Sequence, residues 1–286
     1  MSVRIGFKTS QTDVDWPTLL ALWELADQEL TVFDSGWIFD HFVSPRHGGG
    51  SHEGWTTLAA LAARTRRLQL GHLVVGNTHR HPALTAKMGA ALDHISAGRF
   101  VLGLGAGWHE GEHAMYGWNL PPIGERMAML DAAVQIIQGM WRSPTSFSFE
   151  GAGYRVAAAR CDPAPHTPDG PPVWLGTQGL QRGLRIVAER AQGWNSTKDL
   201  AAFRQKREVL LRHCEAVGRD PAEIEVSTKV SLAESRSRTD ELLAESISFI
   251  EAGVHHLVLQ LPPALGPDAL KRLAHEVAEP LRERFG

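Results

Sequence analysis

The feature that most constrains this chain is a regular alternation of short apolar runs with longer amphipathic patterns. The short runs read as buried strands, and the longer patterns carry apolar residues at three- and four-residue spacing, as helices do. We expect strands at 3–9, 33–39, 68–75, 99–104, 173–175, 193–196, 223–232 and 256–260, and helices at 16–29, 55–65, 82–98, 125–141, 180–191, 200–217, 240–252 and 267–285. Eight such pairs predict a parallel (β/α)8 barrel of the TIM type.

Two stretches depart from this alternation. Residues 147–156 read as a small hairpin around Gly151-Ala152-Gly153, an excursion between the fourth and fifth barrel strands, and residues 108–124 read as irregular. The Pro-rich connection at 162–172 is too short to mark a domain boundary, so we expect one domain over residues 1–286.

Composition narrows the possible functions. With 286 residues and 43% apolar content the chain can bury a large core, and a net charge of −3 gives no reason to expect a nucleic acid or a membrane surface as partner. Cys161 and Cys214 have no metal or redox spacing, which suits a reducing compartment. Neither a signal peptide nor a spanning segment is visible, and the expectation is a cytoplasmic enzyme acting on a small molecule.

The stretch from Leu68 to Gly117 has turn chemistry after both of its strands. The first strand stops at Gly76-Asn77, and the second ends in Gly103-Leu104-Gly105-Ala106-Gly107. Ligands of parallel barrels sit at the carboxyl ends of the strands. We therefore expect one wall of an active site here.

Two motifs in this stretch suggest other chemistry. The three spaced glycines resemble a dinucleotide fingerprint, but no helix opens in the required frame, so we interpret them as room for a bulky cofactor. His109-Glu110-Gly111-Glu112-His113 matches the zinc-protease pattern H-E-x-x-H, yet it lies among glycines and lacks an obvious third ligand. We expect no metal, and assign this segment to a helix start and polar lining of the pocket.

Several segments together resemble a known family. They are Trp37 to Phe42, Gly76 to Ala83, Leu92 to Arg99, Gly103 to Trp108 and Trp174 to Thr177, which occur in the order found in the luciferase-like monooxygenase superfamily. Within it, the chain most resembles oxidoreductases that use the deazaflavin coenzyme F420. The resemblance implies a barrel of the bacterial luciferase-like type with a flavin or deazaflavin at the carboxyl ends of its strands.

The resemblance also implies roles for individual residues. His41 would approach the reactive centre of the ring system, to orient substrate or to exchange a proton as hydride moves. Asp40 precedes it, and alternation along a strand would place one of the two toward the barrel mouth and the other toward the helices. Gly176-Thr177-Gln178, between a strand and a helix, would hold the cofactor phosphate.

The remaining cofactor contacts would come from the central stretch. The family commonly has a β-bulge and a non-proline cis peptide in the third strand, expected here at Leu73–Val74. Asn77 suits the pyrimidine edge of a flavin, or is simply a turn residue. The residues implied to contact the cofactor there are Leu73, Val74, Val75, Gly76, Asn77, Gly105, Ala106, Gly107 and Trp108.

The identity of the cofactor rests on two departures from related sequences. Ala106 stands where bacterial luciferases have an arginine that clamps the phosphate of FMN, which favours F420. Trp108 stands where the F420-dependent sugar-phosphate dehydrogenases have a glutamate, which leaves acid/base chemistry and substrate open. Basic residues available for the anionic cofactor tail are Arg46, Arg80, Arg182 and Lys198, and tryptophans available for the pocket are Trp37, Trp55, Trp108 and Trp118.

The sequence thus predicts an F420-dependent oxidoreductase that transfers hydride between the deazaflavin and a small organic substrate. One alternative is an FMN-dependent monooxygenase supplied with reduced flavin by a partner reductase. Another is a non-catalytic barrel that binds a cofactor. We further expect a homodimer, with a flavin or F420 reductase as a possible redox partner.

Overall fold

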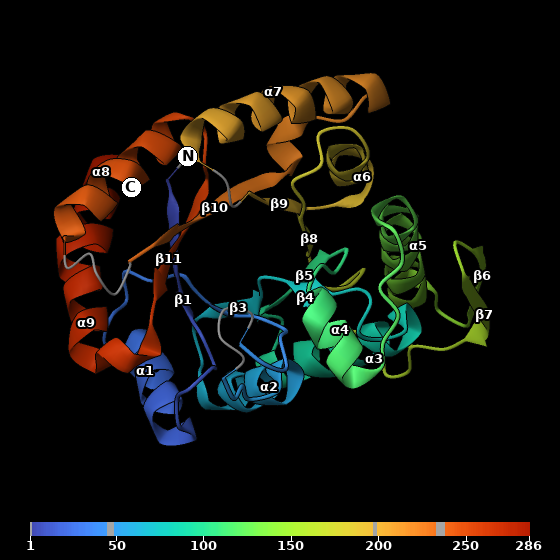
Figure 1. The fold of residues 1–286 in the computed structure, drawn as a ribbon, viewed down its shortest axis with the longest axis horizontal. Helices are drawn as coiled ribbons and strands as arrows, with labels where there is room; N and C mark the ends of the chain where they lie inside the picture. The colour runs from blue at the N-terminus through green and yellow to red at the C-terminus, as the bar shows by residue number, and fades with distance from the viewer. Residues whose placement is uncertain (1, 45–48, 197–198, 233–237) are drawn as a thin grey trace.

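The strands form one closed parallel sheet with the helices outside it (Figure 1). The computed structural model describes residues 2–44, 49–196, 199–232 and 238–286. Within these residues the order around the barrel is β3-β2-β1-β11-β10-β9-β8-β5, and a β3–β5 pairing closes it. The strands are β1 (Arg4–Thr9), β2 (Ser35–Ile38), β3 (Gln69–His72), β4 (Val75–Gly76), β5 (Phe100–Gly105), β8 (Val173–Gly176), β9 (Gly193–Ser196), β10 (Glu225–Ser231) and β11 (His256–Leu261).

The predicted (β/α)8 barrel is therefore confirmed, with one refinement. The run expected as a single third strand is divided into β3 and β4, and both pieces pair with β5. The predicted excursion is also confirmed: an antiparallel hairpin of β6 (Phe147–Gly151) and β7 (Tyr154–Ala159) projects beyond the barrel between β5 and β8 (Figure 1).

The helices agree with the expected pattern except in two places. Residues 108–124, expected to be irregular, contain the short helix α4 (Glu110–Tyr116), because His109 caps it and Gly117 ends it with a φ of 70°. The expected closing helix is three pieces, α9 (Gly266–Leu273), η3 (Ala274–Ala278) and α10 (Glu279–Phe285). The others are α1 (Trp16–Gln28), α2 (Gly54–Arg64), α3 (Pro82–Ser96), α5 (Ile123–Arg142), α6 (Arg182–Arg190), α7 (Leu200–Val217) and α8 (Thr239–Glu251). No helix in the described ranges is long and apolar enough to cross a membrane.

Strand alternation sends one set of side chains into the barrel and the other toward the helices. Inside, Trp37 and Trp174 stack with their ring centroids 4.9 Å apart, and Leu73, Val101 and Val258 complete a buried apolar layer. This layer separates the carboxyl ends of the strands from their amino ends.

The amino ends hold a buried polar chain that superficially resembles a hydrolytic triad. Glu225 lies 2.9 Å from His256 Nδ1, and His256 Nε2 lies 2.7 Å from Ser35 Oγ. Ser35 already accepts a hydrogen bond from Trp37 Nε1 at 2.8 Å and is fully buried. Because no substrate can reach this hydroxyl, we assign the chain a role in filling the barrel floor.

Candidate active site

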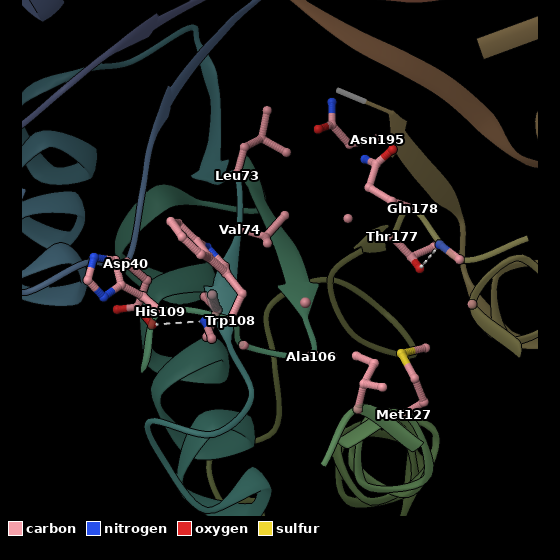
Figure 2. Close-up of a pocket in the computed structure, with 18 of the residues that line it drawn as sticks. Asp40, Leu73, Val74, Ala106, Trp108, His109, Met127, Thr177, Gln178 and Asn195 are labelled. Carbon is pink, nitrogen blue, oxygen red and sulfur yellow. Dashed lines mark hydrogen bonds between the residues drawn. The ribbon is translucent and has the colours of Figure 1, made fainter. Parts of the chain in front are cut away.

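A cavity of about 620 Å³ opens at the carboxyl ends of β2, β4, β5, β8 and β9. This volume suits a cofactor or a drug-sized ligand. Figure 2 shows Asp40, His109 and Trp108 on one side of it, Thr177, Gln178 and Asn195 on the other side, and Leu73 and Val74 between these two groups. The lining consists of Asp40, His41, Leu73, Val74, Val75, Gly76, His79, Gly105, Ala106, Gly107, Trp108, His109, Ile123, Met127, Gly176, Thr177, Gln178, Gly179, Gln181, Arg182, Gly183 and Asn195.

Thirteen of the fourteen residues expected from the sequence lie on this lining, and Asn77 does not. The Asn77 side chain is buried and donates from Nδ2 to the Tyr154 hydroxyl at 3.1 Å, so it connects the turn after β4 to the hairpin. Of its two proposed roles, the structure places it in that of a turn residue.

The back wall of the cavity is the break between β3 and β4. The expected non-proline cis peptide at Leu73–Val74 is confirmed. Lys8 Nζ, buried inside the barrel, donates to the Leu73 carbonyl oxygen at 2.7 Å. Burial, and to a lesser extent the nearby Lys229 charge, holds the pKa of Lys8 well below 10.5. Lys8 therefore fixes the Leu73 carbonyl, and with it the back wall, from inside the barrel.

Glycines in β5 and β8 make room for this wall. An added Cβ on Gly105 would lie 2.7 Å from Val74 Cγ2, and one on Gly176 would lie 2.8 Å from Val74 Cγ1. An added Cβ on Gly103 would overlap the His72 carbonyl oxygen. Gly105 and Gly176 thus admit Val74, and Val74 shapes the cavity. That the glycines also leave room for a bulky cofactor stays a prediction, since Gly105 and Gly107 line the cavity.

The turn after β8 offers backbone and hydroxyl donors. Thr177 lies against the start of α6, where an added Cβ on Gly183 would overlap its hydroxyl oxygen. Figure 2 shows Thr177 and Gln178 at the side of the cavity nearest α6. Gln178 is oriented by Lys206, whose ammonium donates to its Oε1. First-turn N–H groups of a helix favour an anion, so this turn suits a phosphate.

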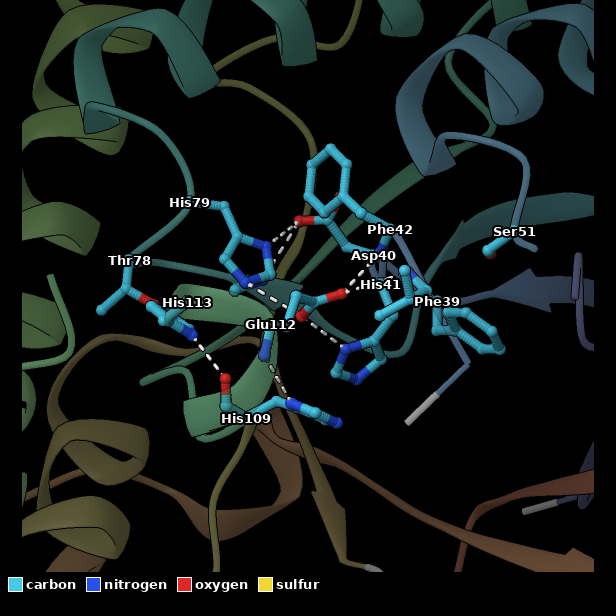
Figure 3. A network of polar contacts seen from close by, with 12 residues as sticks. Phe39, Asp40, His41, Phe42, Ser51, Thr78, His79, His109, Glu112 and His113 are labelled. Atoms are coloured by element: carbon cyan, nitrogen blue, oxygen red, sulfur yellow. Dashed lines mark hydrogen bonds and ion pairs between the residues drawn. The ribbon is translucent and has the colours of Figure 1, made fainter. Parts of the chain in front are cut away.

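His41 is paired with a buried carboxylate that no strand pattern indicated. His41 Nδ1 lies 2.9 Å from Glu112 Oε2, and the Phe42 N–H donates to Glu112 Oε1 at 2.6 Å (Figure 3). Burial alone would raise the pKa of the Glu112 carboxyl, but the hydrogen bonds from His41 and Phe42 outweigh it and place the pKa below 4.5. Glu112 is therefore ionised near neutrality and acts as an acceptor.

Asp40 belongs to the same group of charges. Its Oδ2 accepts from Arg80 Nη1 at 2.7 Å and from the Gly76 N–H at 3.2 Å, and lies 3.3 Å from His79 Nδ1. Burial opposes ionisation, but His79 and Arg80 lower the pKa of Asp40 below 3.8. We call Asp40, His41, His79, Arg80 and Glu112 the histidine–carboxylate network.

Two expectations about this network need correction. Asp40 and His41 both line the cavity instead of facing opposite ways, because β2 ends at Ile38 and strand alternation no longer applies to them. Arg80 does not face a cofactor tail, since it pairs with Asp40 and with Glu53 at 2.8 Å. Arg182 does line the cavity, whereas Arg46 and Lys198 lie outside the described residues.

The H-E-x-x-H segment is committed to structural contacts. His109 Nδ1 accepts the Glu112 N–H at 2.9 Å as the cap of α4. His113 Nδ1 donates to the His109 carbonyl at 2.8 Å, and its Nε2 lies 2.7 Å from the Thr78 hydroxyl (Figure 3). The described ranges contain no group of three or more His, Cys, Asp or Glu placed to hold a metal ion. The expected helix start is confirmed, and of the two histidines only His109 lines the cavity.

Sequence reasoning missed several lining residues. Asn195 at the end of β9 donates from Nδ2 to Ser227 Oγ at 2.9 Å, and Ser227 in turn donates to the Trp194 carbonyl. Because the side-chain nitrogen of Asn195 makes the bond to Ser227, its side-chain oxygen Oδ1 can accept a hydrogen bond from a ligand. The position of Asn195 at a strand end was the one signal that could have found it. His79 lay within the segment Gly76 to Ala83 that carries the resemblance, but was given no role. Trp37, Trp55 and Trp118 pack elsewhere, so Trp108 is the one tryptophan of the four that lines the cavity.

These features define a class: a TIM-barrel protein whose cavity, at the carboxyl ends of the strands, combines a histidine–carboxylate pair with a turn suited to an anion. The sequence profile of the family described as luciferase-like monooxygenase matches residues 4–282. The chain belongs to this family.

Named relatives and solved structures agree with that assignment. An F420-dependent glucose-6-phosphate dehydrogenase of Amycolatopsis mediterranei is 33% identical over 62% of this chain and 52% of its own length. A phthiodiolone/phenolphthiodiolone dimycocerosates ketoreductase of Mycobacterium kansasii is 27% identical over 94% of this chain and 75% of its own. An F420-dependent secondary alcohol dehydrogenase, solved with an F420-acetone adduct, has the same fold, with a TM-score of 0.82 at 17% identity over 91% of this chain and 93% of its own. This chain spans about half the length of several curated glucose-6-phosphate dehydrogenase relatives.

Proposed function

We propose that the protein is an F420-dependent oxidoreductase that moves a hydride between the deazaflavin and an organic alcohol or carbonyl compound. The observation that carries the proposal is the cavity itself, which has His41 with its carboxylate partner at one side and, at the other, a turn whose donors suit an anion. Relatives at about 33% identity named as F420-dependent enzymes support the choice of cofactor.

The residues present fit such a cofactor. A planar ring system would lie against Leu73 and Val74, since the glycines of β5 and β8 let Val74 recede from the cavity. The phosphate would sit at Thr177 and the first turn of α6. The Asn195 carbonyl oxygen would accept from a ligand N–H or O–H. When bound, the deazaflavin supplies the hydride-accepting or hydride-donating carbon.

The protein's own contribution is proton transfer and orientation. Because an ionised carboxylate can only accept, Glu112 keeps the proton of His41 on Nδ1 and leaves Nε2 as the basic nitrogen. With its side chain 16% exposed, His41 can present Nε2 to a substrate hydroxyl in the cavity. Nε2 would take the hydroxyl proton as hydride leaves the substrate carbon, and would return it in the reverse direction. The Glu112 charge stabilises the imidazolium formed in between.

The principal alternative is an FMN-dependent monooxygenase, since the family is described as luciferase-like monooxygenase. Ala106 lines the cavity where an arginine would clamp the phosphate of FMN, and it offers no charge. We therefore expect the protein to prefer F420. We also propose that residues 1–286 act as one domain in a cytoplasmic homodimer, with an F420 or flavin reductase as redox partner.

A direct titration tests the cofactor. Purified protein should quench F420 fluorescence with a dissociation constant in the micromolar range and bind oxidised FMN more weakly. Tight FMN binding without any response to F420 would overturn the proposal. His41→Ala serves as a control for mechanism, because it should bind F420 as the parent does while losing turnover.

A further inference from the structure

The charges around the reaction end of the cavity are predominantly negative. The carboxylates of Asp40 and Glu53 share one guanidinium, that of Arg80, and the Glu112 carboxylate lies beside His41 and His79. With both histidines of the histidine–carboxylate network neutral, this group carries two net negative charges, and protonation of one histidine still leaves one. A phosphate carries about −1.5 to −2 charge at neutral pH and would be repelled here.

The described lining contains one Lys or Arg, which is Arg182. It comes from the first turn of α6, close to Thr177, and donates to the Gly124 carbonyl at 2.6 Å. The positive end of the cavity is thus the end suited to the cofactor phosphate. The described residues near His41 offer a phosphosugar no equivalent partner.

The rim beside this cavity is apolar and exposed. Nine large apolar side chains are exposed in the described part of the chain, and four of them fall within residues 108–123, from the end of β5 to the first residue of α5. They are Trp108, Met115, Tyr116 and Ile123, with exposed fractions of 61%, 65%, 43% and 60%. Trp108 and Ile123 also line the cavity. Met115 and Tyr116 are exposed on α4, in the segment that joins these two residues. Single exposed apolar residues need no explanation, but two at the mouth of a ligand cavity, with two more on the adjoining helix, indicate a binding surface.

We propose that the substrate is an uncharged, lipophilic secondary alcohol or the corresponding ketone, whose chain leaves the cavity over these four side chains. The inference rests on the proposed function because it concerns the substrate of the same site. In oxidation, the carbinol C–H bond breaks and its two electrons leave with the hydrogen as hydride to F420. The hydroxyl proton passes to His41 Nε2, and the C–O bond becomes a carbonyl. Reduction reverses each transfer.

A chain-length series tests this substrate class. The F420-loaded protein is assayed with 2-propanol through 2-decanol, and the reduced form with the matching 2-ketones. We expect kcat/KM to rise roughly fourfold for each methylene group that the rim buries. A flat series, no turnover of the whole series, or saturable turnover of glucose 6-phosphate would overturn the proposal.

Two outcomes separate this inference from the function on which it rests. If F420 binds in the fluorescence titration but the alcohol series fails, only the substrate assignment is wrong. If F420 does not bind, the proposed function fails first and the substrate assignment fails with it.

Two exposed isoleucines provide a matched pair of variants. Ile123→Ser should reduce the slope of the series for the longer alcohols, because Ile123 lies on the rim. Ile95→Ser should leave the slope unchanged, because Ile95, 48% exposed, lies in the last turn of α3, toward the amino ends of the strands. Equal slopes in both variants would contradict the proposal.

Met115→Ser distinguishes a substrate surface from a contact between two copies of the chain. Met115 is exposed on α4 and does not line the cavity. We expect a reduced slope for the longest alcohols with unchanged mass by light scattering and an unchanged dissociation constant for F420. An unchanged slope together with a change from dimer to monomer would make the rim a subunit interface, and the proposal would be wrong.

Discussion

Replacing Gly105 by Ala should weaken cofactor binding about tenfold while leaving the barrel folded. The added Cβ would lie 2.7 Å from Val74 Cγ2, about 0.7 Å short of the 3.4 Å at which ordinary contact begins. Val74 already fills the space beside Gly176 and Gly103, where an added Cβ would lie 2.8 and 3.3 Å from its Cγ1. It must therefore move into the cavity, against the face of a bound ring.

The magnitude follows from the energetics of crowded side chains. Overpacking of this kind typically costs about 1–3 kcal/mol. If about 1.4 kcal/mol of this cost destabilises the cofactor-bound state, the dissociation constant becomes tenfold larger. Val74→Ala removes both Cγ atoms, so the double variant should recover most of the lost affinity. The coupling between the two positions should then be about 1–2 kcal/mol, within the range for residues in contact.

The assay is an F420 fluorescence titration and a melting curve for the parent, both single variants and the double variant. Gly124→Ala is the matched control, because an added Cβ there meets nothing within 4 Å. It should leave F420 affinity unchanged and raise stability slightly, since Gly124 lies within the helix α5. Parent-like binding by Gly105→Ala, or no recovery in the double variant, would refute the assignment of Val74 as the cofactor wall.

Further predictions concern the network and its supports. Glu112→Gln should destabilise the fold by about 1–3 kcal/mol near neutral pH, because the buried carboxylate accepts from His41 and Phe42. Since the pKa of Glu112 is lowered on folding, its contribution to stability is present above about pH 4.5 and is lost as pH falls further. Urea denaturation should therefore show the free energy of unfolding of the variant approaching that of the parent in acid. Because folding lowers the pKa of Lys8, the unfolded chain binds one more proton than the folded chain below pH 10.5, and the free energy of unfolding of the parent rises with pH. Lys8→Met should reduce this rise, as measured by denaturation curves at about pH 7 and pH 9.5. A chelator should leave turnover unchanged, and stoichiometric zinc in elemental analysis, lost together with activity, would show that His109 and His113 bind metal after all.

Much of the architecture could be predicted because strands and helices leave local signals. Apolar periodicity of two or about 3.6 residues, with Pro, Gly and capping residues at the boundaries, marks each element within a few positions of itself. Since parallel strands place their carboxyl ends on one face, locating those ends was enough to place His41, Gly76, Gly105 and Thr177 on a common cavity.

Contacts between distant segments left no such signal. His41 and Glu112 are 71 positions apart in the sequence. A helix start was expected in segment 108–124, but this segment lacked a clear helical period and nothing in it indicated that Glu112 would be a buried partner of His41. Asn77 and Asn195 illustrate the same limit: both follow or end a strand, but hydrogen bonds to Tyr154 and to Ser227 decide which of them faces the ligand.

The sequence by itself determined which residues stand at the catalytic face, because that depends on where each strand ends along the chain. Only the tertiary structure decided what each of them does there. Val74 fills the space beside Gly105, and Arg80 forms ion pairs with two carboxylates. Glu112 accepts the hydrogen bond that keeps the proton of His41 on Nδ1. Each of these depends on the packing of one strand end against another, where a shift of less than 1 Å changes which atoms meet.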